Sequence, residues 1–441
     1  MTVRAHRTKT RKLAAAAGLA GAVLLSLGAC SSSSKSSSAP PSSGPSGAAG
    51  SSGSGTLLAP LKVTGAISGP GVTATTITIG DIATVTGTQP GVFQGANDGM
   101  DAWAAYVNAA GGIAGHQVKV VHLDDANDCN TYKADIKQLA SSVFAAVGTF
   151  SVQDSCGTSI LAAHPDFPYI PGAALAAGDY SLPNVYEANP SPLGVSTTLY
   201  AYVKSQFPND ITHAAELELG NPILLENTAK SIGYKFVYQR VYPTTETSFL
   251  SDILRMKADG VKIVDMTYSD VNYPVMFLQE AAQQNYHPDA VISVAVYDAN
   301  FLKLLGSPSL AKNLYVDVPS AMWLGNTDRP TNPEINTLDT WMARAKPGVN
   351  LTLYAVDAWA AGQLFLQGLQ NAGPQITQAS LLQGLSQISN WDTSGLTPPA
   401  NPAKRTGSAC EVIGGIINGQ WSRRHPQTGF DCSGVYIVPK L

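Results

Sequence analysis

Segments with strand and helix patterns alternate along most of this chain, and that alternation restricts the folds open to it. Residues 76–86 (TITIGDIATVT) alternate apolar and polar side chains and then run into Gly and Pro, which predicts a strand that ends in a loop. Residues 96–109 carry apolar side chains at helical spacing, and Gly111-Gly112 follow where a helix end favours a left-handed backbone. A second strand is predicted at 118–123 (VKVVHL).

The same order continues through the chain. A helix is predicted over Lys133–Phe144 and a short apolar strand over 144–150. Further strand and helix patterns follow at YKFVYQRVYP (234–243), FLSDILRMKADG (249–260), VKIVDMTY (261–268), NYPVMFLQEAAQQ (272–284) and AVISVAVY (290–297). This spacing predicts an α/β fold, in which parallel sheets carry helices on both faces and the unit is built twice.

The C-terminal region has a different pattern. Asn418-Gly419 lies between two apolar runs in VIGGIINGQWSRR, which is a strong hairpin signal. We expect this hairpin to be a terminal appendage.

The N-terminal region predicts export. Five Lys and Arg lie within the first 12 residues, and residues 13–29 form an apolar run that ends in small residues, the order found in a secretory signal. A transmembrane anchor is the alternative, but the run is short and is interrupted by Gly and Ser. Leu27-Gly28-Ala29-Cys30 resembles the lipobox of bacterial lipoproteins, which implies removal of residues 1–29 and lipid attachment to Cys30.

Residues 30–56 are rich in Ser, Gly and Pro and cannot bury a core. We expect a flexible tether that reaches roughly 28 Å and holds the folded body above a membrane through the lipid alone. Loss of five basic residues with the signal changes the formal charge from −4 to −9. An acidic body is a poor candidate for direct binding to nucleic acid or to an anionic bilayer, and we expect a monomer.

Four further cysteines agree with an oxidising compartment. The spacing favours local pairs, Cys129 with Cys156 and Cys410 with Cys432, although three connectivities are possible. A zinc site is the competing interpretation, but the sequence contains no CxxC pair and no suitably spaced His. No metal or other cofactor is expected.

Six segments together carry a family resemblance. Residues 76–125 contain a strand, a Gly-rich turn, a helix that ends in NAAGGIAG and a strand that ends in Asp-Asp. The other five are GTFS (148–151), PYIPGAA (168–174), PNVYEANPS (183–191), YAVDAWAAGQLFLQGLQNAG (354–373) and WDTSGLTPP (391–399). In this order they resemble the type I periplasmic binding proteins of the branched-chain amino acid class, from about residue 75 to 441. Some members also have a disulfide where Cys129 and Cys156 lie.

The resemblance implies a venus-flytrap of two Rossmann-like lobes joined by a three-segment hinge. About 385 residues from Leu57 onward would also be long for one lobe. We expect lobe 1 to comprise residues 57–190 and 319–395, and lobe 2 to comprise residues 191–318 and 396–441, the latter including the hairpin. Members of this family capture a small solute and deliver it to the permease of an ABC importer. A ligand-sensing or scaffold lipoprotein of the same fold is the alternative.

The expected pocket departs from that of amino acid binders. Relatives hold the ligand carboxylate with two hydroxyls and its ammonium with a Tyr and an acid. Here those positions read Val152, Leu175, Asp270 and Val294 or Ala295, which favours another small polar or partly aromatic solute.

A different register is also open. Alignment on Cys156 brings Gly157, Thr158 and Ser159 into the ligand loop and restores hydroxyl groups there.

Candidate ligand contacts follow from loop positions. The alternatives are a packed core ring for Phe93, a solvated loop for 153–155 and a helix cap for Asp270. The candidates are Phe93, Ser151, Val152, Gln153, Asp154, Ser155, the backbone groups of Ala173 and Ala174, Tyr268, Asp270 and Tyr297.

Nothing in the sequence predicts catalysis. It has no G-x-S-x-G elbow, no P-loop and no His pair at helical spacing. Asp124 and Asp125 are adjacent, so they point to opposite faces of a strand and cannot act as a carboxylate pair. We therefore do not expect an enzyme.

Overall fold

A computed structural model describes residues 57–88, 90–190, 194–219, 223–267, 269–294 and 296–437. All of these lie within residues 53–441, which group into one unit. Cys30, the tether and the signal segment fall outside the described residues, as do Tyr268 and Ala295. None of the helices in the described part is long and apolar enough to cross a membrane.

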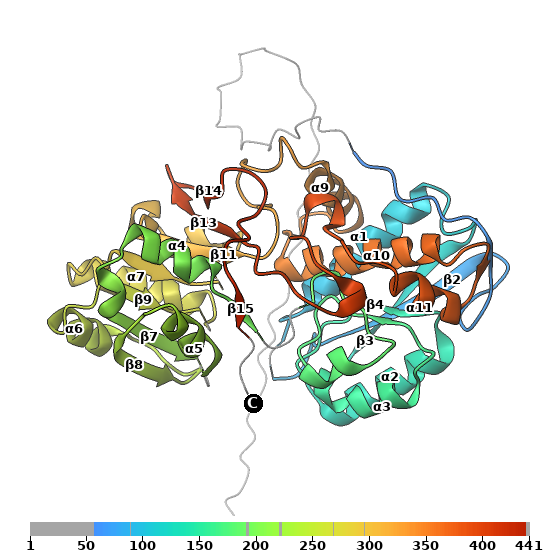
Figure 1. Ribbon diagram of the computed structural model, residues 1–441, viewed down its shortest axis with the longest axis horizontal. Coiled ribbons are helices and arrows are strands. Elements are labelled where there is room, and N and C mark those ends of the chain that lie inside the picture. The colour runs from blue at the N-terminus through green and yellow to red at the C-terminus, as the bar shows by residue number, and fades with distance from the viewer. Residues whose placement is uncertain are drawn as a thin grey trace, which may run out of the picture. The chain divides into compact units, whose positions relative to one another are not determined.

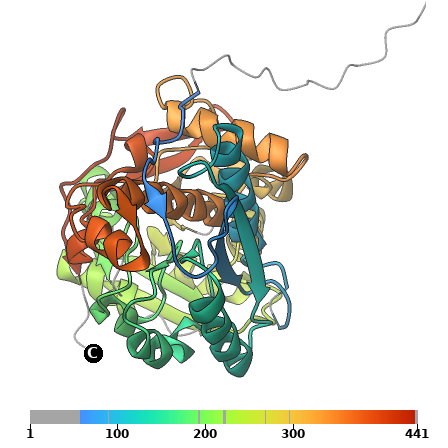
Figure 2. The same ribbon diagram turned by 90° about the vertical axis from the view of Figure 1, so that its right-hand side faces the viewer.

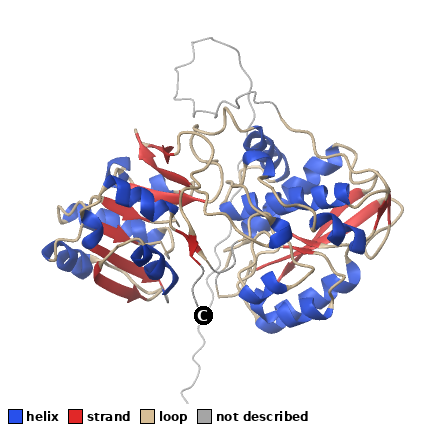
Figure 3. Cartoon of the chain, in the orientation of Figure 1, coloured by secondary structure: helices blue, strands red, loops and turns tan. Residues whose placement is uncertain are grey.

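The first sheet has four parallel strands in the order β3-β2-β4-β5. Figure 1 labels β2, β3 and β4, and Figure 3 draws strands in red and helices in blue. They are β2 (Thr76–Ala83), β3 (Gln117–Asp124), β4 (Ala146–Val147) and β5 (Tyr169–Ile170). Its helices are α1 (Gln94–Ala109), α2 (Cys129–Ser142), α3 (Thr158–Ala163), α9 (Pro333–Ala345), α10 (Leu353–Asn371) and α11 (Gln378–Leu385).

The two faces of this sheet are covered differently. One core, which includes Tyr132, Ile136 and Leu161, buries α2 and α3 against the sheet. The opposite face packs against α1 and α10, whose Trp103 and Phe365 rings lie 6.1 Å apart. In Figure 2 the orange-red helices α10 and α11 lie beside the blue-to-teal strands.

The second sheet has seven strands in the order β14-β13-β11-β10-β9-β7-β8. Five run parallel: β7 (Ala214–Leu219), β8 (Phe236–Tyr242), β9 (Ile263–Asp265), β10 (Ala290–Ile292) and β11 (Leu314–Val318). Two are antiparallel: β13 (Val412–Ile417) and β14 (Gln420–His425). Its helices are α4 (Thr198–Gln206), α5 (Ile223–Ser231), α6 (Leu250–Ala258), α7 (Asn272–Gln283) and α8 (Phe301–Leu305).

Strands β13 and β14 form the predicted hairpin, and Asn418 and Gly419 both have positive φ, at 51° and 78°. The expectation of a terminal appendage is wrong, because β13 pairs with β11 and extends the second sheet. The physical reason is burial: Val412 and Ile413 are 0% exposed and complete the core of that sheet.

The chain passes three times between the two sheets. It leaves β5 for β7, leaves β11 for α9, and leaves α11 for β13. Strand β6 (Val195–Ser196) lies in the first of these segments and pairs antiparallel with β15 (Tyr436–Ile437) of the C-terminal tail. Two α/β units and three crossing segments are the fold implied by the family resemblance, and they are present in the structure.

Smaller elements complete the described chain. Strand β1 (Ala66–Ile67) pairs with β12 (Gln375–Ile376). The 3-10 helices are η1 (Asp154–Cys156), η2 (Ala177–Ser181), η3 (Asp210–Thr212), η4 (Pro308–Ala311), η5 (Thr393–Gly395) and η6 (Pro402–Lys404).

A network of charged side chains around the buried Asp81 ties β2 and β3 to α1. Asp81 is fully buried, and its Oδ1 lies 2.8 Å from Nδ1 of His122, whose Nε2 lies 3.0 Å from Asp101 Oδ1. Lys346 from the end of α9 completes the network at 2.6 Å from Asp101 Oδ2. Burial alone would lower the pKa of His122, but its hydrogen bonds to Asp101 and Asp81 raise that pKa to about 10.

Replacement His122→Asn is expected to reduce the free energy of unfolding by about 3 kcal/mol at pH 6, because Asp81 stays buried without its cation. His122 has a higher pKa in the folded state, so its contribution is complete below about pH 6.5 and is lost as pH rises toward 10. Urea unfolding from pH 6 to 10 should therefore show the gap between wild type and variant shrinking. His213 is exposed, so His213→Asn is the control. A gap that does not change with pH would contradict this account.

Candidate functional site

A cavity of about 450 Å³ lies where the three crossing segments meet the strand ends, and we call it the crossing cavity. Thr267 follows β9, and Val294, Tyr297 and Asp298 follow β10, so the cavity lies at the carboxyl ends of strands of the second sheet. The other residues that line it are Asn189, Pro190, Gly194, Val195, Ser196, Asp317, Pro319, Trp323, Leu351, Thr352, Leu353, Tyr354, Ser408, Cys410, Glu411 and Tyr436.

Aromatic rings form much of the wall. Tyr297 packs edge-on against Trp323 with ring centroids 4.5 Å apart, and its hydroxyl accepts a hydrogen bond from Leu324 N at 2.8 Å. Tyr354, at the start of α10, lies 4.9 Å from the ring of Phe93 and 5.1 Å from that of Phe150. Tyr354 therefore connects the cavity to the loops that follow β2 and β4.

Two carboxyl groups share one side of the cavity. Glu411 is 7% exposed, and its Oε2 accepts a hydrogen bond from Leu199 N at 3.1 Å. Oδ1 of Asp317 is shut off from solvent and has no hydrogen-bond partner among the described residues. Burial raises the pKa of Asp317 to about 7. Burial also raises the pKa of Glu411 well above its usual range, and the carboxyl of Asp317 adds to that rise.

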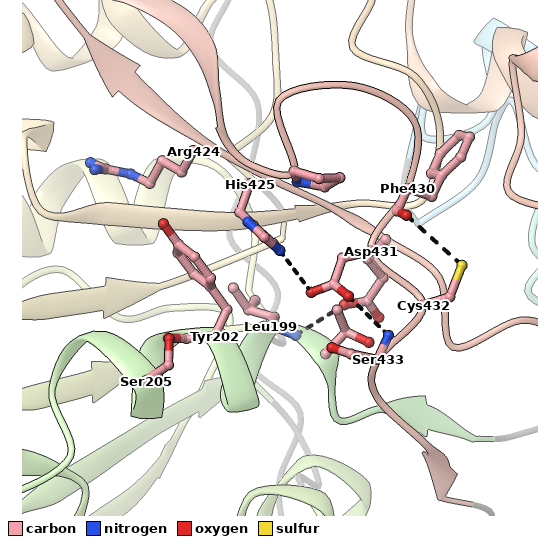
Figure 4. A network of polar contacts seen from close by, with 12 residues as sticks. Leu199, Tyr202, Ser205, Arg424, His425, Phe430, Asp431, Cys432 and Ser433 are labelled. Atoms are coloured by element: carbon pink, nitrogen blue, oxygen red, sulfur yellow. Dashed lines mark hydrogen bonds and ion pairs between the residues drawn. The ribbon is translucent and has the colours of Figure 1, made fainter.

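A second polar network is centred on Asp431, which pairs with Glu411 in an isolated antiparallel bridge. Nε2 of His425 lies 3.2 Å from Oδ2 of Asp431, and Ser433 N donates to Asp431 Oδ1 at 2.9 Å (Figure 4). The ring of His425 also stacks on Tyr202 with centroids 5.0 Å apart. His425 is thus already engaged by an acid and a ring.

The predicted ligand loop after β4 uses its polar groups within the first α/β unit. Ser151 donates a hydrogen bond to Asp125 Oδ2, and Gln153 Nε2 donates to Asn127 Oδ1 at 2.7 Å. Asp154 is buried and accepts hydrogen bonds from the backbone N–H groups of residues 175 and 176. Val152 and Ser155 are exposed. None of these five candidates lines the crossing cavity.

The remaining candidates lie in several places. Phe93 is buried, and its contact with Tyr354 places it behind the cavity wall. Ala174 N donates to Glu187 Oε2 at 3.2 Å, and Ala173 packs at the edge of the main core. Asp270 accepts a hydrogen bond from Asn272 N at 3.0 Å, just before α7.

Tyr297 alone among the described candidates lines the cavity. Tyr268 lies outside the described residues. The ligand-contact role of each candidate stays a prediction.

The structure also shows where the residues of the two possible registers of the ligand loop lie. Thr158 begins α3, and its hydroxyl donates to Asp179 Oδ1 at 2.6 Å. Ser159 and Leu175 are exposed, whereas Val294 lines the cavity.

Sequence reasoning missed Asp317, Glu411 and Ser196. One signal was present: Asp317 is the single charged residue of LYVDV, an otherwise buried strand pattern. Glu411 similarly comes directly before the apolar run of β13. A lone acid in such a position needs a partner or a ligand.

Both expected disulfides are present, Cys129 with Cys156 and Cys410 with Cys432. The first joins the start of α2 to η1, and the second joins the third crossing segment to the C-terminal tail. The described residues contain no group of three or more His, Cys, Asp or Glu that could hold a metal ion.

A comparison with known proteins identifies the family of this chain. The sequence model of the periplasmic binding protein family matches residues 76–410, which is most of the chain. The chain belongs to the periplasmic binding protein family. The resemblance stated from its motifs is therefore confirmed, and the family consists of extracytoplasmic solute-binding proteins, not enzymes.

One curated relative is the Leu/Ile/Val-binding protein homolog 8 of Brucella abortus (strain 2308), which is 27% identical over 212 residues. That match covers 44% of this chain and 52% of the relative, so this periplasmic binding protein spans about half the length of the curated relatives it matches.

Solved structures show the same fold at low sequence identity. A fatty acid ABC transporter substrate-binding protein from Thermomonospora curvata has a TM-score of 0.65 at 16% identity, and the match covers 83% of this chain and 94% of that one. The substrate binding protein LivJ of the branched-chain amino acid transporter from Streptococcus pneumoniae, in complex with isoleucine, has a TM-score of 0.61 at 16% identity, with 82% and 100% covered. A branched chain amino acid ABC transporter protein from Thermus thermophilus with bound valine gives 0.65 at 12%, with 81% and 97% covered.

Proposed function

We propose that this periplasmic binding protein is the solute receptor of an ABC importer and that it captures a small polar or amino-acid-like solute in the crossing cavity. The observation that carries the proposal is the position of the cavity, which combines strand ends of the second sheet, the start of α10 and residues from all three crossing segments. A solute there would contact parts of both α/β units at once. Such a solute stabilises the arrangement in which both sets of contacts are made, which is how ligands close two-lobed receptors.

The proposed lobes are residues 57–190 with 319–395, and residues 191–318 with 396–441. Residues 1–29 would be a signal peptide, and a lipid on Cys30 would hold the receptor at the outer face of the cell membrane through the 30–56 tether. The permease subunits of the importer would be its membrane partner. The similarity to a fatty acid substrate-binding protein and to an isoleucine-bound LivJ supports a small organic solute without selecting one.

Thermal unfolding of the full-length protein against amino acids, amides, amines, polyols, nucleobases and carboxylic acids tests this function. A solute at about 100 times its dissociation constant is expected to add roughly 2.7 kcal/mol to the free energy of unfolding. Uptake of the stabilising solute should then fall in cells that lack the protein.

Binding without any effect on uptake would contradict the importer role and favour a ligand sensor of the same fold. If no solute of the panel stabilised the protein, the receptor role itself would be contradicted.

A further inference from the structure

The charged residues that line the crossing cavity are all acidic. They are Asp298, Asp317 and Glu411, and no Lys, Arg or His occurs among the lining residues that the structure describes. Arg424, on β14, is engaged away from the cavity lining: it donates to Leu314 O at 3.0 Å and lies over the ring of Tyr315. A solute that carries a carboxylate would therefore meet three acids and no cationic side chain. A cationic solute would meet complementary charge.

Asp317 and Glu411 are held where a ligand donor could reach both. In the antiparallel pairing of β11 with β13, Asp317 lies opposite Ile413. Glu411 lies two residues before Ile413, directly before the start of β13. Both residues line the cavity, and Oδ1 of Asp317 is enclosed and accepts no hydrogen bond from the residues that the structure describes. An ammonium group beside the two carboxyl groups would offset part of the free-energy cost of burying them.

The rest of the wall suits the apolar part of such a solute. Leu351 and Leu353 line it from the start of α10, and Tyr297, Trp323 and Tyr354 contribute rings. Aromatic rings stabilise a nearby ammonium group as well as an apolar body. A cavity of about 450 Å³ is in the range of small-molecule sites.

We propose that the crossing cavity takes an organic amine, whose ammonium group is bound by Asp317 and Glu411 and whose apolar body lies against the aromatic wall. This inference rests on the proposed function, because it names the class of solute that the receptor captures. It differs from the binding of a free amino acid, in which a carboxylate must also be held.

The raised pKa values of the two acids agree with this geometry. With the pKa of Asp317 raised to about 7 by burial, the pair holds a proton in the empty protein near neutral pH, and the ammonium group would replace it. Affinity should therefore increase as pH rises from 6 to 8, by up to about tenfold per unit below the pKa. The other titratable side chains that line the cavity are Asp298, Tyr297, Tyr354 and Tyr436. Asp431 also acts on Glu411, and Oδ2 of Asp431 lies 3.2 Å from Nε2 of His425.

Three probes of nearly equal size test the proposal: hexylamine as the cation, hexanol as the neutral molecule and hexanoate as the anion. Leucine is added as a solute that carries both an ammonium and a carboxylate group. Calorimetric titration of the full-length protein at pH 8 is expected to show binding of hexylamine at least tenfold tighter than hexanol and no binding of hexanoate. Asp317→Asn should weaken hexylamine binding at least tenfold. Asp166 is exposed and distant in sequence from the site, so Asp166→Asn is the matched control.

Folding of the key variant is checked separately. Within the part of the chain that the structure describes, Oδ1 of Asp317 accepts no hydrogen bond, so Asp317→Asn is expected to unfold at the wild-type temperature or above it at pH 8. Glu411→Gln serves as a second variant with the same expected loss of hexylamine affinity.

The outcomes separate this inference from the proposed function. If leucine or hexanoate binds and hexylamine does not, the amine assignment is overturned while the receptor function stands. Equal hexylamine binding by wild type and Asp317→Asn, or affinity that does not change between pH 6 and 8, also overturns it. If no solute of any class binds, both claims fail together.

Discussion

Replacement Arg423→Met is expected to reduce the free energy of unfolding by about 4 kcal/mol, the largest loss we expect from a single side chain. Arg423 is 6% exposed, and its Nε and Nη2 donate to both carboxylate oxygens of Asp328, at 2.5 and 2.6 Å. Its Nη1 also donates to Gly429 O at 2.6 Å. Asp328 lies in the second crossing segment, so this pair fastens that segment to the C-terminal hairpin.

The loss arises because Asp328, 6% exposed, would keep its charge without a cation beside it. Met fills a similar volume, so the charge and not a cavity is tested. Arg255 forms an ion pair with Asp259 on the surface of α6, where its side chain is 67% exposed. The control Arg255→Met should therefore cost less than about 0.5 kcal/mol. Equal losses in urea unfolding of the two variants would contradict the account.

Gly99→Val is expected to cost about 3 kcal/mol, because helices α1 and α10 approach each other at this residue. A Cβ at position 99 would lie 2.5 Å from Ala355 O and 2.8 Å from Ala355 Cα, both backbone atoms that cannot rotate away. The helices would have to separate, which disturbs the rings of Trp103 and Phe365 between them.

Helix propensity cannot account for such a loss, since Val is a slightly better helix former than Gly. Gln138→Val, on the exposed face of α2, controls for a β-branched residue in a helix and should change stability by less than about 0.7 kcal/mol. Gly99→Val would contradict the close approach if urea unfolding showed it to be as stable as wild type.

The local pattern of the chain predicted most of the elements. The alternation at 76–86 gave a strand that the structure places at Thr76–Ala83, and the helix expected at 96–109 runs over Gln94–Ala109. Differences occur where one residue changes the backbone or caps it. The apolar run at 144–150 forms a strand only at Ala146–Val147, because Gly148 has a φ of 84° and ends the extended backbone.

Helix α2 begins at Cys129, four residues before the expected start. The side chain of Asp128 accepts hydrogen bonds from Asn130 N and Thr131 N and so starts the helix there. This capping signal was visible in the sequence. The place of the hairpin in the second sheet was not visible, because it depends on pairing between residues far apart in the sequence, such as Val316 and Gly414.

The candidate site was harder to predict than the fold. Loop position placed Ser151 and Asp154 near strand ends, but their hydrogen-bond partners are Asp125 and the backbone of residues 175 and 176, which no local pattern reveals. Asp317 and Glu411 are brought to one wall of the cavity by strand pairing alone. Sequence indicates at which ends of the strands a ligand binds, whereas side-chain partners decide which residues remain available to it.

The central claim is that a single solute molecule binds in the crossing cavity. Calorimetric titration of the best solute from the thermal panel into the full-length protein tests it most directly when Val294, which lines the cavity, is replaced by Trp. We predict one site per wild-type chain, at least tenfold weaker binding by Val294→Trp, and unchanged binding by the control Val237→Trp, whose residue is 46% exposed on β8. Full-affinity binding by Val294→Trp would place the solute elsewhere and contradict the account.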